Sequence, residues 1–213
     1  YPDPNTYPDA NSDANSDIMT SFYDLKNVVM QEGEDYKTRP HIWHRFLSGM
    51  TDGVSLEFGV WTGASINYMA RVRPDVKFHG FDSFEGLPED WIRGHPAGHF
   101  STDIAKLKFV ENVEVHKGWF EHTLPSFVEA FQGTLQGVHI DCDLGSSTDC
   151  ILSNLSPLLK QHKPLLLFDE FYNYSGFEDH EFKSFLDWVN REEVAFKVLG
   201  RNINHQQVLI QLC

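Results

Sequence analysis

The chain has 213 residues, 41% hydrophobic and 23% charged, which is the balance of an ordinary globular protein. Its formal net charge of −14 argues against a nucleic-acid partner, because backbone phosphates are bound by lysine and arginine. The sequence has no run of about 18 apolar residues, so no membrane span is predicted, and no signal peptide is evident. Cys142, Cys150 and Cys213 lack the spacing of a disulfide framework or a thiolate metal site. We therefore expect a cytoplasmic protein with reduced thiols.

The N-terminal part divides into two segments. Residues 1–16 are polar and repetitive, which predicts a flexible tail or linker and leaves open a larger multidomain parent. Apolar residues then recur at helical spacing over 17–31, and a second helix is expected after Pro40. Residues 17–50 are thus predicted to form a helical cap ahead of the main domain, residues 51–213.

From Val54 onward, strand and helix patterns alternate, as in a parallel sheet with helices on both faces. Five parallel strands are expected at 54–58, 77–82, 112–117, 137–141 and 164–169. The intervening helices are expected at 65–73, 124–132, 147–160 and 177–191. Two last strands, 195–200 and 206–212, are joined by a loop too short for a crossover, so they should form an antiparallel hairpin. The prediction is a seven-stranded, Rossmann-like α/β fold.

A glycine turn follows the first of these strands. The segment SLEFGVWTG, residues 55–63, reads as a strand, a turn with Gly59 and Gly63, and the start of a helix. This order brings backbone N–H groups close to a small-molecule cofactor. The turn is neither GxGxxG nor a P-loop, and no lysine follows it, which disfavours nucleoside triphosphate hydrolysis. The alternative is that the glycines serve only a tight turn.

Asp82 ends the second predicted strand, 23 residues after Gly59. An acidic residue about 20 residues past a glycine turn commonly accepts hydrogen bonds from ribose hydroxyls. The alternative is a turn-forming aspartate in the loop FDSFEGLP.

Acidic residues also end the fourth and fifth predicted strands: Asp141 and Asp143 in HIDCD, and Asp169 and Glu170 in LLLFDE. The carboxyl ends of parallel strands share one edge of the sheet, so we expect these side chains to converge. Such oxygen ligands suit a hard divalent ion, Mg²⁺ first and then Ca²⁺ or Mn²⁺. The alternative is that the acids cap helices or contact the cofactor without a metal.

His180 offers a competing chemistry. It lies in GFEDHEFKSF, on the helix predicted after the fifth strand, and a neutral histidine there would serve as a general base for a hydroxyl or thiol acceptor. The alternative is a partly exposed structural histidine.

With a hairpin closing a parallel sheet, residues 51–213 resemble the class I S-adenosylmethionine (SAM) dependent methyltransferases. The resemblance implies that SAM is the cofactor. It would place Glu57 near the amino end of the methionine part, Ser65 at its carboxylate, and Gly118 with Trp119 beside the adenine ring. Trp119 as plain core filling remains an alternative. The predicted cofactor-binding residues are Glu57, Gly59, Gly63, Ser65, Asp82, Ser83, Gly118, Trp119 and Asp141.

Five segments, GVWTGAS, FDSFEGLP, GWFEHTLP, IDCDLGSST and FDEF, are similar to the macrocin O-methyltransferase (TylF-like) family of SAM- and Mg²⁺-dependent sugar O-methyltransferases from natural-product pathways. That resemblance implies Asp141, Asp169 and Glu170 as the metal ligands. Two positions depart from it: Glu170 replaces a second aspartate, and Gly145 replaces an aromatic residue.

The sequence thus predicts a SAM-dependent O-methyltransferase that acts on a hydroxyl of a small or carrier-bound natural-product-type substrate, with Mg²⁺. Asp141 is the expected catalytic residue, binding the ion and taking up the hydroxyl proton. Two alternatives stay open. One is a metal-independent methyltransferase of the same fold that uses His180 or proximity; the other is a non-catalytic binding module in a larger assembly. The sequence also leaves a homo-oligomer open.

Overall fold

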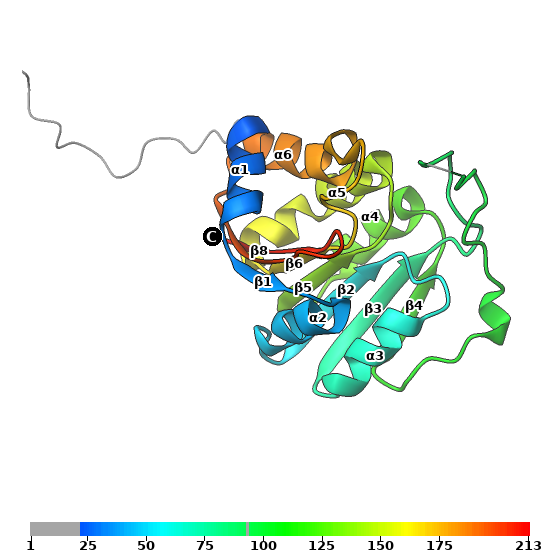
Figure 1. Ribbon diagram of the computed structural model, residues 1–213. Coiled ribbons are helices and arrows are strands. Elements are labelled where there is room, and N and C mark those ends of the chain that lie inside the picture. The colour runs from blue at the N-terminus through cyan, green and yellow to red at the C-terminus, as the bar shows by residue number, and fades with distance from the viewer. Residues whose placement is uncertain (1–21, 93) are drawn as a thin grey trace, which may run out of the picture.

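An eight-stranded sheet runs through the whole computed structural model, which describes residues 22–92 and 94–213 (Figure 1). The strand order is β1-β7-β8-β6-β5-β2-β3-β4. The predicted tail, residues 1–16, lies outside the described residues, and the proposed division at residue 50 stays a prediction.

The five expected parallel strands are all present, and β2 lies at the centre of their sheet. They are β2 (Gly53–Phe58), β3 (Val76–Asp82), β4 (Val113–Lys117), β5 (Leu135–Ile140) and β6 (Leu165–Phe168). The hairpin of β7 (Phe196–Asn202) and β8 (Val208–Leu212) places β8 antiparallel between β6 and β7. The predicted fold class, a mostly parallel Rossmann-like sheet with an antiparallel terminal hairpin, is confirmed.

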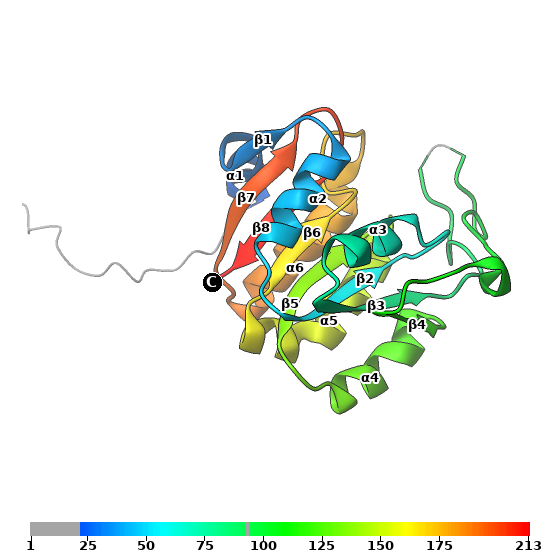
Figure 2. The same cartoon turned by 90° about the horizontal axis from the view of Figure 1, so that it is seen from below.

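One strand was not predicted. β1 (Glu34–Tyr36) pairs in parallel with β7 and extends the sheet by an edge strand (Figure 2). Its three residues, EDY, show no alternation of apolar and polar side chains, so the sequence pattern carries no strand signal there.

Helices cover both faces of the sheet, as expected (Figure 1). One face carries α1 (Phe22–Gln31), α4 (Phe120–Ala130), α5 (Gly145–His162) and α6 (Glu181–Glu192). The other carries α2 (Arg39–Ser48) and α3 (Ala64–Val72). Each layer encloses its own cluster of buried side chains: Phe58 and Phe168 belong to the first cluster, Ile66 and Phe78 to the second. A short 3₁₀ helix, Ile104–Lys106, precedes β4.

Helices α2, α3 and α5 begin one or two residues earlier than predicted, and two other helices differ more. α4 begins at Phe120, ahead of the start predicted at residue 124, and Pro125 lies inside the helix. The helix predicted over 177–191 is interrupted, because His180 has a non-helical backbone (φ −112°, ψ −131°) between the 3₁₀ helix Phe177–Asp179 and α6. Among the described residues, no helix combines the length and apolar character needed to cross a membrane.

Candidate active site

A cavity of about 580 Å³ opens at the carboxyl ends of the central strands. Residues that end or follow four strands line it: Gly59 after β2, Asp82 at the end of β3, Asp141 after β5 and Glu170 after β6. This is the place where open parallel sheets of this kind bind their ligands.

The glycine turn shapes one wall of this cavity. Gly59 has φ +88°, and a Cβ atom there would lie 1.8 Å from the backbone oxygen of Asp141. Only glycine fits this position, because the chain of β5 passes too close for any side chain. Gly63 (φ +75°) starts α3 and packs against Phe109, where a Cβ atom would meet the ring at 2.8 Å.

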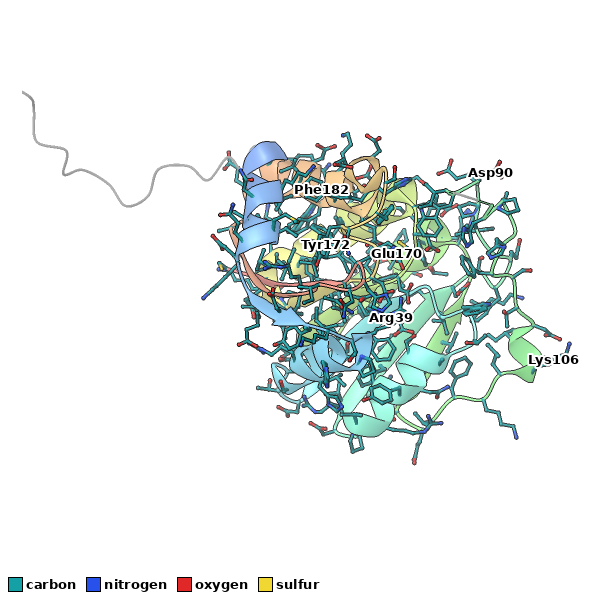
Figure 3. The ribbon with its side chains drawn as sticks, in the orientation of Figure 1. Arg39, Asp90, Lys106, Glu170, Tyr172 and Phe182 are labelled. Atoms are coloured by element: carbon teal, nitrogen blue, oxygen red, sulfur yellow. The ribbon has the colours of Figure 1, made fainter. Side chains whose placement is uncertain are left out.

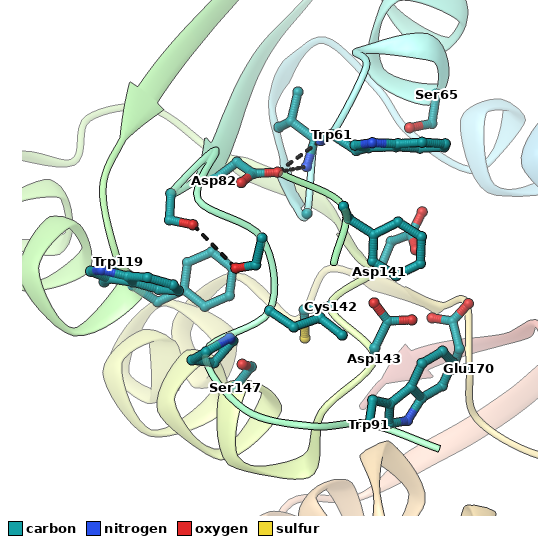
Figure 4. Close-up of a pocket in the computed structure, with 18 of the residues that line it drawn as sticks. Trp61, Ser65, Asp82, Trp91, Trp119, Asp141, Cys142, Asp143, Ser147 and Glu170 are labelled. Atoms are coloured by element: carbon teal, nitrogen blue, oxygen red, sulfur yellow. Dashed lines mark hydrogen bonds between the residues drawn. The ribbon is translucent and has the colours of Figure 1, made fainter. Parts of the chain in front are cut away.

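Asp82 holds the glycine turn in place (Figure 4). Its Oδ2 atom accepts hydrogen bonds from the backbone N–H groups of Val60 at 2.8 Å and Trp61 at 2.7 Å. Its Oδ1 atom accepts one from Phe84 N–H at 2.6 Å. Hydrogen bonds from N–H groups to an ionised carboxylate are the stronger kind, so Asp82 fixes the backbone that faces the cavity.

A buried polar chain runs behind this wall. The Ser65 hydroxyl donates to Glu57 Oε1 at 2.9 Å, and Glu57 Oε2 lies 2.9 Å from His139 Nδ1. The other ring nitrogen, His139 Nε2, is 3.6 Å from Asp169 Oδ1, the distance of an ion pair rather than a hydrogen bond. Burial alone would lower the pKa of His139, but the carboxylates of Asp169 and Glu57 raise it to about 10. The imidazole is therefore a buried cation between two acids.

Five carboxylates gather next to this histidine, and we call them the acid floor: Asp141, Asp143, Asp169, Glu170 and Glu181. The carboxylates of Asp143 and Glu170 point toward each other, with Asp141 beside them (Figure 4). Ligand atoms of His139, Asp141 and Asp169 all lie within 4.8 Å of one another. Glu181 Oε2 accepts a hydrogen bond from Glu170 N–H at 3.1 Å, which links α6 to the end of β6.

The acid floor carries more negative charge than its surroundings neutralise. Loss of hydration and the charge of Asp169 raise the pKa of Asp141 and Glu170 well above the usual range. The same two causes raise the pKa of Asp143 to about 7. Loss of hydration and the nearby Asp143 raise the pKa of Glu181. Carboxylates that repel one another in this way favour either shared protons or a bound cation.

Asp169 is the exception within the acid floor, because it is paired with cations. Arg39, at the start of α2, donates a hydrogen bond to Asp169 Oδ2 at 2.5 Å. The side-chain amide of Gln207 donates to the same oxygen at 3.1 Å. Burial alone would raise the pKa of Asp169, but His139 and Arg39 lower it below its usual value. Arg39 and Glu170 both face the cavity, from α2 and from the end of β6 (Figure 3).

The donor set fits a hard divalent ion. Among the described residues, Asp169 Oδ1 and Glu170 Oε2 are buried carboxylate oxygens without a hydrogen-bond partner. Buried polar atoms are nearly always paired, so orphaned oxygens beside a cavity mark a place for a cation or a polar ligand. Oxygen ligands from Asp141, Asp169 and Glu170 suit Mg²⁺ or Mn²⁺, whereas the protonated ring of His139 has no lone pair to offer an ion.

The sequence-predicted residues fall into three groups. The cavity is lined by Gly59, Ser65, Asp82, Ser83, Gly118, Trp119, Asp141 and Glu170. Glu57, Gly63 and Asp169 lie behind its wall, and the hydroxyl of Ser65 bonds Glu57. His180 is not among the lining residues; its ring stacks on Tyr174 at 6.1 Å and lies 6.5 Å from Trp91.

Several residues that line the cavity were not predicted from the sequence. Arg39 and Trp43 come from α2, and Trp61, Trp91 and Phe100 bring aromatic surface from the turn and from the loop after β3. Trp61 is 50% exposed and meets Phe100 edge to face at 5.5 Å. His139 does not line the cavity but had a usable signal, since it stands two residues before Asp141 near the end of the strand LQGVHI and therefore points to the same side.

The fold and cavity together define a class of α/β enzymes that bind a cofactor at the carboxyl ends of a parallel sheet, over a glycine turn and an acidic strand end. Residues 56–171 match the family model described as methyltransferase domain, and the chain belongs to that family. It is therefore a SAM-dependent methyltransferase, and the predicted enzyme class is confirmed.

Solved structures agree on the fold. The calicheamicin methyltransferase CalS11 matches with a TM-score of 0.63 and 18% identity over 89% of this chain and 79% of that one. The O-methyltransferase NovP matches with a TM-score of 0.60 and 20% identity, covering 81% and 78%. A putative caffeoyl-CoA O-methyltransferase from Staphylococcus aureus matches with a TM-score of 0.51 and 15% identity, covering 91% and 92%. No curated protein matches the chain.

Proposed function

We propose that this methyltransferase transfers the methyl group of SAM to a hydroxyl of a small or carrier-bound natural-product-type substrate, with the help of Mg²⁺. One observation carries the proposal: the acid floor holds two buried carboxylate oxygens without a hydrogen-bond partner, Asp169 Oδ1 and Glu170 Oε2, and Glu170 lines the cavity. A buried oxygen without a hydrogen bond destabilises the folded protein, and a bound cation or polar ligand would remove this cost. Transfer to oxygen suits this arrangement, because a divalent ion activates a hydroxyl.

The cofactor would occupy the half of the cavity between the glycine turn and Trp119. Gly59 and Gly63 let the backbone approach it, and Asp82 Oδ1 accepts one hydrogen bond in the structure and has a lone pair left for a ribose hydroxyl. Ser83, Gly118 and Trp119 line the side proposed for the adenine ring. Glu57 would act from behind, by fixing Ser65 and His139.

SAM supplies an activated methyl group, and Mg²⁺ supplies a positive charge that lowers the pKa of a bound hydroxyl. Asp141, Asp169 and Glu170 would hold the ion. Asp141 is also the proposed proton acceptor, since it lines the cavity beside the place proposed for the ion. Trp43, Trp91 and Phe100 would cover the acceptor with aromatic surface and keep water away from the reacting atoms.

The substrate class rests on two kinds of support. The sequence segments resemble the macrocin O-methyltransferase (TylF-like) family. CalS11, described as a TDP-rhamnose 3′-O-methyltransferase of calicheamicin biosynthesis, shares the fold with a TM-score of 0.54 in a second structure at 17% identity, covering 89% of this chain and 80% of that one. Both point toward a glycosylated or carrier-bound alcohol, and a cytoplasmic location and a homo-oligomer remain part of the same proposal.

The test is methyl transfer to a panel of nucleotide sugars and aglycone alcohols, with protein stripped by chelation and then resupplied with Mg²⁺. We expect activity to fall by at least about 100-fold on stripping and to return with Mg²⁺. Calorimetry on the same stripped protein should still show SAM binding. Full activity after stripping would contradict the metal-dependent form of the proposal, and absent SAM binding would contradict the cofactor assignment.

One observation favours a metal-independent enzyme of the same fold. Arg39 already supplies a cation to Asp169 Oδ2, so part of the charge that an ion would balance is balanced by the chain itself. The variant His180→Ala tests the version of this alternative that uses His180: it should leave activity unchanged if the acid floor activates the acceptor. A loss of activity with normal SAM binding would support His180 as the base.

A further inference from the structure

A second group of metal-ligating side chains lies away from the acid floor, on the last two strands of the sheet. It consists of His79 on β3 with Glu114 and His116 on β4, and we call it the edge-strand cluster. β4 is the edge of the sheet, beside β3 (Figure 2). His79 pairs in register with Glu114, and His116 follows two residues later, so all three side chains project from one face.

The distances within the edge-strand cluster suit a small ion. His79 Nδ1 and His116 Nε2 are 2.8 Å apart. The nearest Glu114 oxygens lie 4.0 Å from His79 Nδ1 and 3.9 Å from His116 Nε2. One ligand atom from each of the three residues lies within 4.8 Å of the other two. Ligand atoms this close can reach a shared zinc ion at the usual bond lengths of about 2.0–2.2 Å for nitrogen and oxygen. Two imidazoles and one carboxylate are a ligand set that zinc takes up with one position left open.

Packing holds both imidazoles in this geometry. The His116 ring stacks on Phe81 with centroids 4.6 Å apart and an interplanar angle of 13°. Phe127 of α4 meets His79 at 5.1 Å and His116 at 5.3 Å, edge to face in both cases. This packing restricts the orientations of both rings before an ion binds, and that lowers the entropic cost of binding.

The cluster also opens to solvent. A second hollow, of about 470 Å³, is lined by all three ligand residues and by Thr123 and Ser126 of α4, and none of its lining residues lines the first cavity. An ion can enter there and keep a water molecule as its fourth ligand. The hydrogen bond between His79 Nδ1 and His116 Nε2 occupies the lone pair of its acceptor, so an ion has to replace this bond. Each neutral imidazole can carry its proton on its other ring nitrogen, and both nitrogens then offer a lone pair to the ion.

We propose that His79, Glu114 and His116 bind a divalent transition-metal ion of the Zn²⁺ class, separate from the ion of the acid floor. Such an ion ties the edge strand β4 to β3 and stabilises the fold by mass action. Lys77, whose Nζ atom lies 2.7 Å from Glu114 Oε2, is the group that the ion has to displace. Lys77 therefore competes with the ion for Glu114. The proposal can be tested by variants expected to weaken the affinity for the ion and by variants expected to strengthen it.

The experiment titrates Zn²⁺ into chelator-stripped full chain, with calorimetry for affinity and thermal melting for stability. All variants are made in an Asp141→Asn background, so that binding at the acid floor is reduced. We expect one zinc ion to bind and to raise the melting temperature. His116→Gln should weaken the affinity at least about tenfold, since it removes one of three ligands. Lys77→Met should strengthen the affinity, since Lys77 is 53% exposed and opposes the ion.

Two further measurements keep the test decisive. Co²⁺ bound in place of zinc should give the intense visible absorption of a tetrahedral site, and His116→Gln should remove it. Zinc affinity that is the same in the parent and in both variants would overturn the proposal. If His116→Gln fails to fold, Lys77→Met decides alone, and an unchanged affinity in that variant overturns the proposal as well.

Discussion

The two halves of the main cavity differ in how completely their carboxylates are hydrogen-bonded. On the cofactor side, Asp82 accepts three backbone N–H groups, and both oxygens of Glu57 are paired. On the acid floor, Asp169 Oδ1, Glu170 Oε2 and Glu181 Oε1 have no hydrogen-bond partner. On the cofactor side, the chain itself supplies the hydrogen bonds of these carboxylates, and they fix the shape of the backbone. On the acid floor, a ligand has to supply the missing partners, which is why we place the chemistry there.

The largest expected effect comes from the cofactor side. Gly59→Ala places a Cβ atom 1.8 Å from the backbone oxygen of Asp141, so the turn has to move away from β5. We expect SAM binding to be lost, or the protein to fail to fold, as judged by calorimetry and circular dichroism. Gly176→Ala is the matched control: its φ of +87° carries the same backbone strain, but nothing lies within 4 Å of the added atom. Equal behaviour of the two variants would contradict the close-approach argument.

The next effect belongs to the acid floor. Asp141→Asn removes the proposed proton acceptor and metal ligand without changing the shape of the side chain. We expect turnover to fall by about 10²- to 10⁴-fold, the usual contribution of a general base. The affinity for SAM should stay within about tenfold, or ~1.4 kcal/mol. If SAM binding collapsed while the protein remained folded, Asp141 would belong to the cofactor half.

A smaller effect is expected from the carboxylate that fixes the glycine turn. Asp82→Asn keeps one acceptor oxygen but loses the charge and at least one of three backbone hydrogen bonds. Hydrogen bonds to charged groups are worth about 1.5–3 kcal/mol, so the free energy of unfolding should fall by about that amount. Urea unfolding without SAM measures this directly. An unchanged unfolding free energy, with weaker SAM binding, would mean that Asp82 serves only the ribose.

The last expected effect, which needs no substitution, is a pH dependence of the metal-free protein. A carboxyl whose pKa is raised by folding, such as Asp143 at about 7, holds its proton in the folded state after the unfolded chain has released it. His139, with a pKa of about 10, keeps a proton that the unfolded chain loses near 6.5. Both groups bind more protons when folded, so stability falls as the pH rises from about 4 to about 7 for Asp143 and from about 6.5 to about 10 for His139.

The measurement is urea unfolding of chelated protein at about pH 5.5 and about pH 8, with a lower unfolding free energy expected at the higher pH. Asp143→Asn should flatten the dependence. Added Mg²⁺ should stabilise the protein more at the higher pH, where the acid floor is ionised. Stability that rises with pH would contradict the claim that the acid floor is overcharged.

The sequence predicted the architecture well because its strands and helices differ in period. The apolar run LLLF predicted a buried strand, β6, and the loop RNINH was too short for anything but a hairpin between β7 and β8. β1 was missed because three polar residues in a strand are recognised only through their partner, β7. The break at His180 was missed for a related reason: the pattern of α6 continues into the segment before it, although the backbone does not.

The candidate site was predictable where function follows from the ends of strands. Asp82, Asp141 and Glu170 each end or follow a strand, and the topology alone brings them to one cavity. Arg39 was not predictable in this way, because it stands 130 residues before Asp169 and reaches it only after α2 has packed on the sheet. Glu181 likewise joins the acid floor through a tertiary contact with Glu170, which no spacing in the sequence encodes.

The most direct test of the account is a crystal structure with SAM and Mn²⁺, with the ion located by its anomalous scattering. The account predicts SAM over the glycine turn and one Mn²⁺ ion within bonding distance of carboxylate oxygens of Asp141, Asp169 and Glu170. It would be contradicted by SAM bound in place with no ion at the acid floor and Arg39 still paired with Asp169.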